Sequence, residues 1–214
     1  MKARFYPVVL SLACFLAAFA AAQAADAATP PHAFVNPDEP LVAAIRQTGE
    51  RAIDHSGSAL LMEVRRVMAS TTPALAIGML HLKDYKLPAA APGQPVVTAI
   101  RRTSLLVRNP ANSPDVADLA ALERIQHQLE LGEEVDKVLV QRVTLPGQSP
   151  EWRVYRPLVT LKQCLDCHGP PGTLAPGVPD TLKVFYPADK ALNFRTGSWR
   201  GLIRVSLTEA AKTP

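Results

Sequence analysis

Cysteine is scarce in this chain, and its scarcity restricts the covalent chemistry that the chain can support. The 214 residues include 3 Cys, and Cys14 lies in an apolar N-terminal segment that we expect to be removed. The mature chain then holds two thiols, Cys164 and Cys167. A disulfide scaffold needs several cysteine pairs. That class is excluded, and the one pairing possible within a molecule joins these two residues.

Aromatic residues and basic clusters are also rare. Aromatic side chains make up 6% of the chain and the formal net charge is +4. Without Lys2 and Arg4, the mature chain carries 21 basic and 19 acidic residues, a net charge of +2. A nearly neutral domain without Lys/Arg runs interleaved with aromatics gives no basis for nucleic-acid binding. Its length of roughly 190 residues suits one domain with a proper core.

The N-terminal segment has the pattern of a secretory signal peptide. Lys2 and Arg4 precede an apolar stretch over residues 8–22, and Ala22-Gln23-Ala24 offers a small-residue cleavage site. A membrane-spanning helix needs about 20 apolar residues, whereas this stretch is shorter and rich in Ala. Cleavage is therefore favoured over a retained membrane anchor. We predict a signal peptide over residues 1–24 and export to the periplasm of a Gram-negative type of cell.

The most specific motif of the mature chain is Cys164-Leu165-Asp166-Cys167-His168. A CxxCH pentapeptide is typical of c-type haem attachment. In such a site both thiols form thioether bonds to the porphyrin edge, and the histidine becomes the proximal ligand of the iron. We therefore predict one covalently attached haem, with Cys164 and Cys167 as attachment points and His168 as an iron ligand. Export fits this prediction, because bacterial cytochrome c maturation machinery attaches haem outside the cytoplasmic membrane.

Two other uses of a CxxC pair remain open. A structural zinc site takes about four ligands, usually from two cysteine pairs or from one pair with two histidines, and no second pair exists. A thioredoxin-type redox pair is expected near a βαβ pattern with the first Cys opening a helix. Here Gly169, Pro170, Pro171 and Gly172 follow the motif and prevent a long helix from continuing.

The coarse periodicity of the chain predicts helices first and strands afterwards. Residues 25–40 form a Pro-rich leader, expected to be an extended arm. Residues 41–68 show helical spacing interrupted near Gly57, which predicts two helices or one kinked helix, and residues 74–82 are ambiguous. After Ser113 as N-cap and Pro114, apolar residues recur at helical spacing as far as the Gly132 stop.

Period-two alternation then predicts antiparallel strands. Residues 138–145 and 152–158 flank a Pro/Gly turn, with Pro157 marking an edge or a strand end. We predict two further strands after the haem motif, at residues 182–186 and 202–207. We therefore predict an α+β domain over residues 41–210, with N-terminal helices packed on an antiparallel sheet and the CxxCH on a loop.

Four segments together resemble a known family of periplasmic single-haem proteins, a haem-binding domain of unknown function with a PAS-like fold. They are Arg101-Arg102-Thr103-Ser104, the RNPAN-type string from Val107 to Asp115, Tyr155-Arg156-Pro157-Leu158 and the closing stretch from Phe194 to Gly201, and the similarity runs from about residue 60 to 207. The resemblance implies a PAS-like sheet, with the haem enclosed between it and the helices. It also implies a sensor or small redox role more than turnover of a substrate, so we expect no enzyme.

One departure from the family concerns the sixth iron ligand. Many relatives carry a Cys before the double-Arg string, where this chain reads Ala76-Ile77-Gly78-Met79-Leu80-His81. Imidazole and thioether are both ordinary haem ligands, so His81 is the favoured substitute and Met79 the second. The alternative is an iron that is open or bound to water, with Met79 in the core and His81 on the surface.

The arginines near the RNPAN string are candidates for contact with the haem propionates. A guanidinium can bind a carboxylate through two parallel hydrogen bonds, and Arg101, Arg102 and Arg108 are the candidates for this contact. The alternative is a solvated surface or a carboxylate partner within the fold.

Three functional classes follow from these observations. The first is a haem-based periplasmic sensor of redox state or of a small ligand such as NO or CO, which acts through a separate signalling or redox partner. The second is an electron-transfer cytochrome. A peroxidase-like enzyme needs an open iron and a positioned distal acid or base, and no residue is singled out for that role.

Overall fold

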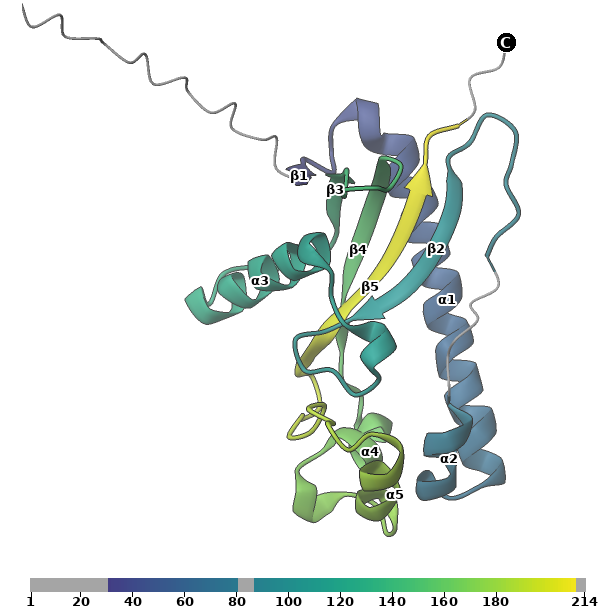
Figure 1. Ribbon diagram of the computed structural model, residues 1–214, viewed down its shortest axis with the longest axis vertical. Helices are drawn as coiled ribbons and strands as arrows, with labels where there is room; N and C mark the ends of the chain where they lie inside the picture. The colour runs from purple at the N-terminus through teal and green to yellow at the C-terminus, as the bar shows by residue number, and fades with distance from the viewer. Residues whose placement is uncertain (1–30, 81–86, 211–214) are drawn as a thin grey trace, which may run out of the picture. The chain divides into compact units, whose positions relative to one another are not determined.

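A five-stranded antiparallel sheet organises the residues described by the computed structural model, which are 31–80 and 87–210 (Figure 1). The order across the sheet is β1-β3-β4-β5-β2. The strands are β1 (His32–Val35), β2 (Val96–Thr103), β3 (Leu139–Val143), β4 (Glu151–Val159) and β5 (Trp199–Thr208). The helices are α1 (Ala43–Ser70), α2 (Pro73–Met79), α3 (Val116–Leu131), α4 (Leu165–His168) and α5 (Val178–Phe185). The predicted α+β class and antiparallel sheet are confirmed.

The predicted signal peptide over residues 1–24 and part of the predicted leader lie outside the described residues. The rest of the leader includes β1, an edge strand that pairs with β3 from His32 opposite Val143 to Val35 opposite Val140. The sequence predicts an extended arm there. In the structure, residues 32–35 of that arm pair with β3 as a strand of the sheet. The domain boundaries at residues 24 and 40 stay predictions.

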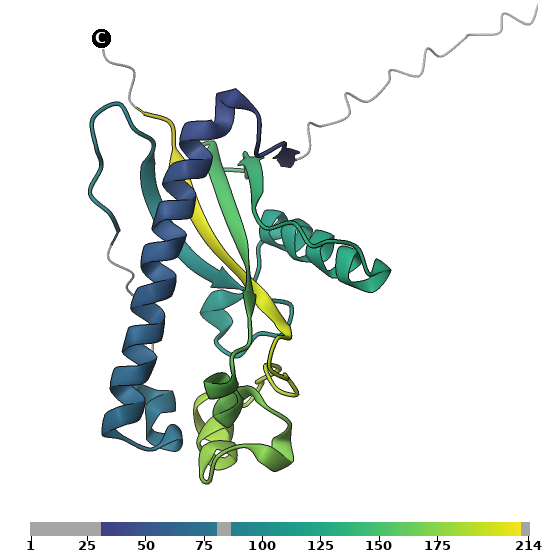
Figure 2. The ribbon, with the colours of Figure 1, turned by 180° about the vertical axis from the view of Figure 1, so that it is seen from behind.

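One face of the sheet is covered by α1, which runs along it (Figure 2). Strand side chains alternate between the two faces, and the residues that point toward α1 are mainly β-branched. The buried cluster on this face consists of Ile45, Ala52 and Ile53 of α1 with Val97, Val138, Val140, Val154, Ile203, Val205 and Leu207. Residues 41–68, predicted as two helices or a kinked one, belong mostly to this single 28-residue helix.

Gly49 sets how closely α1 approaches the sheet. A Cβ built on Gly49 would lie 2.6 Å from Cβ of Val154 on β4, well inside van der Waals contact. A Cβ built on Gly57, two turns further along the same helix, would meet nothing within 4 Å. Packing against the sheet therefore requires a glycine at position 49 but not at position 57.

The opposite face of the sheet is covered by α3, and its core combines apolar and charged groups. Ala121, Leu122 and Ile125 pack on Leu139, Tyr155 and Leu202. At the N-terminus of α3, the Asp118 carboxylate is 1% exposed and accepts hydrogen bonds from Arg153, Arg204 and the Tyr155 hydroxyl at 3.1 to 3.2 Å. These buried charges are paired, as burial requires.

Asp115 connects this network to the helix end. Its side chain accepts hydrogen bonds from the backbone N–H groups of Ala117 and Asp118, and Asp118 completes a capping box. Arg153 also donates to Asp115 at 2.7 Å. Burial opposes the charge on Asp115, but Arg153, the Asp118 N–H and the charge of Arg204 together hold its pKa below the usual value. The N-cap predicted at Ser113 is therefore wrong by two residues, because Asp115 has both the acceptor geometry and the buried cations.

A second correction concerns residues 182–186, predicted as a strand. They fall mainly in α5, which follows Gly177 and has Pro179 in its first turn. A short apolar run fits either class, and here the Pro near the helix start decides in favour of a helix. Pro157 lies where β4 has a neighbour on one side, as the sequence predicts for a proline in a strand. It pairs with Leu202 of β5, whereas the pairing of β4 with β3 ends at Tyr155.

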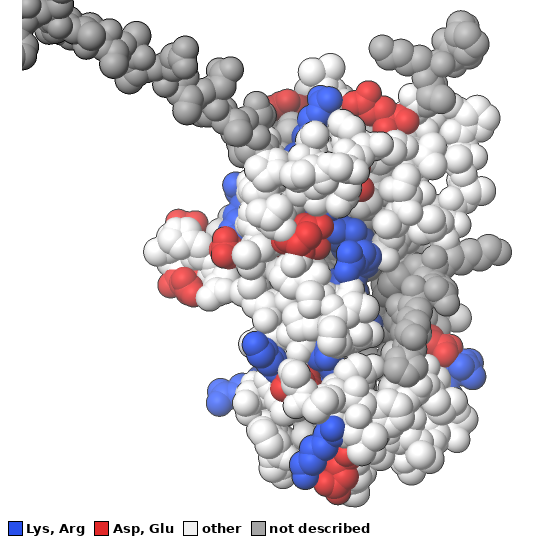
Figure 3. Space-filling view, viewed as in Figure 1, with Lys and Arg blue, Asp and Glu red and all other residues white. Residues whose placement is uncertain are grey.

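Acidic and basic side chains are interspersed over the face of the molecule seen in Figure 3, without a field of one sign. Within residues 31–80 and 87–210, no helix combines the length and the apolar character needed to cross a membrane.

The two glycines of α1 predict opposite effects of one substitution. Gly49→Ala should lower the free energy of unfolding by about 1–3 kcal/mol, because the new methyl group overpacks against Val154. Gly57→Ala should raise it by up to about 1 kcal/mol, because Ala is the better helix former and meets no neighbour. Urea denaturation of both variants checks this, and a Gly49→Ala protein as stable as the wild type would contradict the close approach.

Candidate functional site

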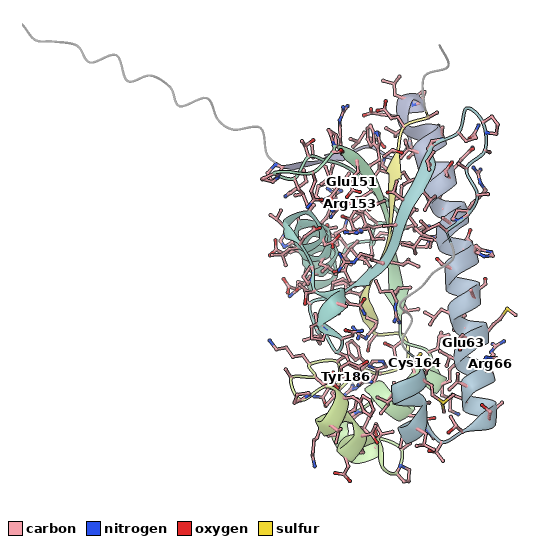
Figure 4. All side chains as sticks on the ribbon, turned by 45° about the vertical axis from the view of Figure 1, so that its right-hand side comes forward. Glu63, Arg66, Glu151, Arg153, Cys164 and Tyr186 are labelled. Atoms are coloured by element: carbon pink, nitrogen blue, oxygen red, sulfur yellow. The ribbon has the colours of Figure 1, made fainter. Side chains whose placement is uncertain are left out.

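The CxxCH motif lies beyond the end of the sheet, immediately after β4 (Figure 1). A 3-10 turn over Lys162–Cys164 leads directly into α4, so the motif occupies two short helical turns instead of the predicted irregular loop. In Figure 4, Cys164 lies at the end of the molecule away from Glu151 and Arg153 on β4. We call residues 162–169 the CxxCH segment.

An apolar cluster surrounds this segment. Cys167 packs against Ile77 of α2 and Val178 and Leu182 of α5, each of which is at most 7% exposed. The Phe185 ring lies 3.4 Å from the position that a Cβ on Gly78 would take, so α2 and α5 are in direct contact. The described part of the ambiguous segment 74–82 thus lies mostly in α2, a helix that helps to bury the second cysteine.

Both cysteines are free thiols and partly buried. Burial raises the pKa of the Cys167 thiol, the charge of Arg108 opposes that shift, and Asp166 and Cys164 reinforce it. Within the described part of the chain, no group of three His, Cys, Asp or Glu residues is placed to hold a metal ion.

The His168 imidazole is oriented through one ring nitrogen. Its Nδ1–H donates to the carbonyl oxygen of Ala191 at 2.8 Å, which leaves Nε2 free to act as a ligand. Burial lowers the pKa of His168 to about 3, assisted by the charges of Arg108, Arg200 and Arg102 and opposed by the Ala191 carbonyl. The ring is therefore neutral at ordinary pH, which is the form that binds iron.

A second loop, residues 189–194, holds the CxxCH segment from the other side. The N–H groups of Asn193 and Phe194 donate to the carbonyl oxygens of Gly169 and His168, both at 3.0 Å. The Phe194 ring meets the imidazole edge-on, with ring centroids 6.3 Å apart. Gly169 is tightly confined, because a Cβ there would lie 2.7 Å from the Leu165 carbonyl oxygen.

Arg108 joins these two segments. Its guanidinium donates to the Cys167 carbonyl oxygen at 2.5 Å and to the Ala191 carbonyl oxygen at 3.3 Å. It also forms a buried ion pair with Asp189 at 3.0 Å, the two side chains being 12% and 6% exposed. The sequence offers Arg108 two roles, contact with a haem propionate or with a carboxylate inside the fold. In the structure it contacts a carboxylate inside the fold, that of Asp189.

The other two candidate arginines lie on opposite faces of β2. Arg102 is opposite Ile203 and so faces the side of α1, while Arg101 is opposite Arg204 on the side of α3. Arg101 donates to the Ala111 carbonyl oxygen at 2.5 Å. Arg102 acts electrostatically on His168. The structure thus brings Arg102 and Arg108 toward His168 and does not bring Arg101 there.

Arg200, at the start of β5, was missed as a site residue. It stacks on Phe194, with its guanidinium carbon 5.0 Å from the ring centroid, and donates to the Ser104 hydroxyl and the Leu106 carbonyl oxygen at 2.7 and 3.0 Å. Asp189 and Ala191 were also missed. Phe194 and Arg200 stand in the closing stretch that carried the family resemblance, so that stretch held a usable signal.

The structure gives less support to the predicted sixth ligands. Met79 is the last residue of α2 and is 51% exposed. His81 lies outside the described residues. Both stay predictions.

A family model named Tll0287-like matches residues 59–208. The match covers more than half of the chain, so the protein belongs to the Tll0287-like family, and the predicted family membership is confirmed. Among solved structures, the cyanobacterial haem-protein Tll0287 matches with a TM-score of 0.42 and 19% identity, over 84% of this chain and all of that one. A likeness at this level supports no conclusion by itself. A comparison with curated proteins finds no match.

Arg108 offers a test of how the site is held. Arg108→Gln should lower the free energy of unfolding by about 3–5 kcal/mol, because it leaves the buried Asp189 carboxylate without its partner. Arg124→Gln removes an arginine from the more exposed pair with Asp136 and should cost less than about 1 kcal/mol. Thermal and urea unfolding measure both effects, and equal losses in the two variants would contradict the structural role of Arg108.

Proposed function

We propose that this protein is a periplasmic haem protein that binds one c-type haem. Cys164 and Cys167 would be the thioether attachment points, and His168 would supply its Nε2 to the iron. The observation that carries the proposal is the His168 side chain, which is neutral and oriented by the Ala191 carbonyl within a CxxCH segment. Haem ligation by histidine typically relies on such a partner at the second ring nitrogen.

The surroundings of the motif also suit a haem. Cys167 lies in an apolar cluster, as a porphyrin edge requires, and arginine side chains next to the histidine supply positive charge. The family takes its name from Tll0287, a protein described as a cyanobacterial haem-protein. Family membership and donor chemistry therefore support the same cofactor. When bound, the haem supplies a one-electron redox centre and an iron coordination site.

We further propose that the protein senses redox state or a small ligand through a partner protein, without turnover of a substrate. The segment 108–115 supports this role. Arg108 at its start contacts the CxxCH segment, and Asp115 at its end caps α3 and binds Arg153. With haem bound, a displacement of the CxxCH segment would have a path through Arg108 and residues 109–115 to α3, where a partner could detect it.

The alternative is electron transfer, which needs a six-coordinate iron that does not exchange ligands. His81 is the proposed sixth ligand, with Met79 as the second candidate. A peroxidase-like activity has no positioned acid or base among the described residues at the site, and we do not propose it.

Covalent haem is tested directly by expression with periplasmic maturation. The wild type should gain the mass of one haem on a peptide containing Cys164 and Cys167, and its pyridine haemochrome spectrum should be that of two thioether bonds. Cys164→Ser and Cys167→Ser should each shift that spectrum to a single thioether bond, and the double variant should lose covalent haem. Unmodified thiols in the matured wild type would overturn the proposal.

Ligand exchange at the iron separates sensing from electron transfer. If the protein is a sensor, we expect CO or NO to bind the reduced protein and change its optical spectrum. His81→Ala or Met79→Ala should then speed binding by about tenfold or more when the replaced side chain is the ligand that the gas displaces. A low-spin iron that ignores both gases in the wild type favours electron transfer and contradicts gas sensing. Optical and EPR spectra of the oxidised and reduced proteins give the answer.

A further inference from the structure

We propose that Arg102 and Arg200 together form the carboxylate-binding site for the haem propionates, while Arg108 and Arg101 serve the fold. This inference rests on the proposed function, because it presupposes a haem at His168. Arg200 thereby gains a role that sequence patterns did not suggest, and the four arginines divide into a ligand-binding pair and a structural pair.

The Arg200 guanidinium is held on one side only. It stacks on Phe194 at 5.0 Å, and its Nη1 donates the two hydrogen bonds to Ser104 and Leu106. Among the described residues, Nε and Nη2 have no acceptor. Phe194 in turn lies edge-on to the His168 ring, so one aromatic ring contacts both the guanidinium and the predicted proximal ligand.

Arg102 lies near the end of β2, two residues before Ser104, whose hydroxyl accepts a hydrogen bond from Arg200. Its side chain is partly buried on the sheet face that carries Ile203, and within the described residues it has no carboxylate partner and no hydrogen bond. Its charge acts on both Arg200 and His168. A partly buried arginine without a partner is uncommon, because an unpaired charge away from water is costly.

The local charge balance calls for an anion. The charges of Arg102, Arg108 and Arg200 all act on His168, and Asp189, a carboxylate that acts on Arg200, is paired with Arg108. The pKa of Arg200 is lowered to about 10, first by burial and then by the charges of Arg102 and Arg108, with Asp189 acting in the opposite direction. Within residues 31–80 and 87–210, neither Arg102 nor Arg200 forms an ion pair of its own.

A bound haem would bring two carboxylates to this position. Guanidinium groups pair with carboxylates through two parallel hydrogen bonds, and the two unpaired arginines match the two propionates. Arg101 does not take part, because it points to the other face of the sheet and is bonded to Ala111. The site is thus complete in donors and charge for the two propionates of one haem.

Arg102→Gln, Arg200→Gln and the control Arg195→Gln, all matured with haem, test the assignment. Arg195 is exposed, and within the described residues its side chain forms no ion pair, so its variant removes the same charge from outside the site. The propionate bending mode in the resonance Raman spectrum should shift in the first two variants and not in the control. The equilibrium constant for haem reduction should fall about tenfold, which is about 59 mV.

Lysine variants separate hydrogen bonding from charge alone. Arg102→Lys and Arg200→Lys keep the positive charge and should restore most of the midpoint potential, whereas the propionate mode should stay shifted because the planar fork is lost. An unchanged mode in both Gln variants of a haem-loaded protein would overturn this inference and leave the proposed function intact. A wild type without covalent haem would overturn the proposed function itself, so the two failures are distinguishable.

Discussion

The guanidinium of Arg108 links the CxxCH segment to the loop 189–194, two segments that are about 20 residues apart in the chain. It pairs with Asp189 and donates to the carbonyl oxygens of Cys167 and Ala191. The Ala191 oxygen is also the acceptor for His168 Nδ1–H. The orientation of the histidine therefore depends on a carbonyl that Arg108 fixes. The loop 189–194 and the CxxCH segment are also joined by the backbone hydrogen bonds from Asn193 to Gly169 and from Phe194 to His168, and Arg108 adds the side-chain link that fixes the Ala191 carbonyl.

The sheet supplies the rigid frame to which this arrangement is attached. Its two faces are stabilised differently, by an apolar interface with α1 and by the paired charges of Asp118, Arg153 and Arg204 under α3. Both β4 and β5 run into the site, because the CxxCH segment follows β4 and Arg200 lies at the start of β5. These strands are paired neighbours in the sheet, and their pairing fixes the spacing between motif and arginine.

The elements that sequence analysis located best were those with strong local signals. The helix ending at Gly132, the strand pair around residues 138–158 and the CxxCH motif each follow from periodicity or spacing alone. The errors arose where tertiary contacts decide: residues 182–186 fold mainly as a helix against α2, and Asp115 replaces Ser113 as the cap because buried arginines bind it. Asp189 and Arg200 were missed because their partners, Arg108 and Ser104, are 81 and 96 residues away in the chain.

The most direct test of the central claim is NMR spectroscopy of the haem-loaded protein with nitrogen-15 in its histidines. We predict that His168 binds iron through Nε2 and keeps a slowly exchanging proton on Nδ1, because the Ala191 carbonyl accepts it. Arg108→Gln should speed the exchange of that proton. A His168 ring that shows no interaction with the iron, or that binds it through Nδ1, would contradict this account.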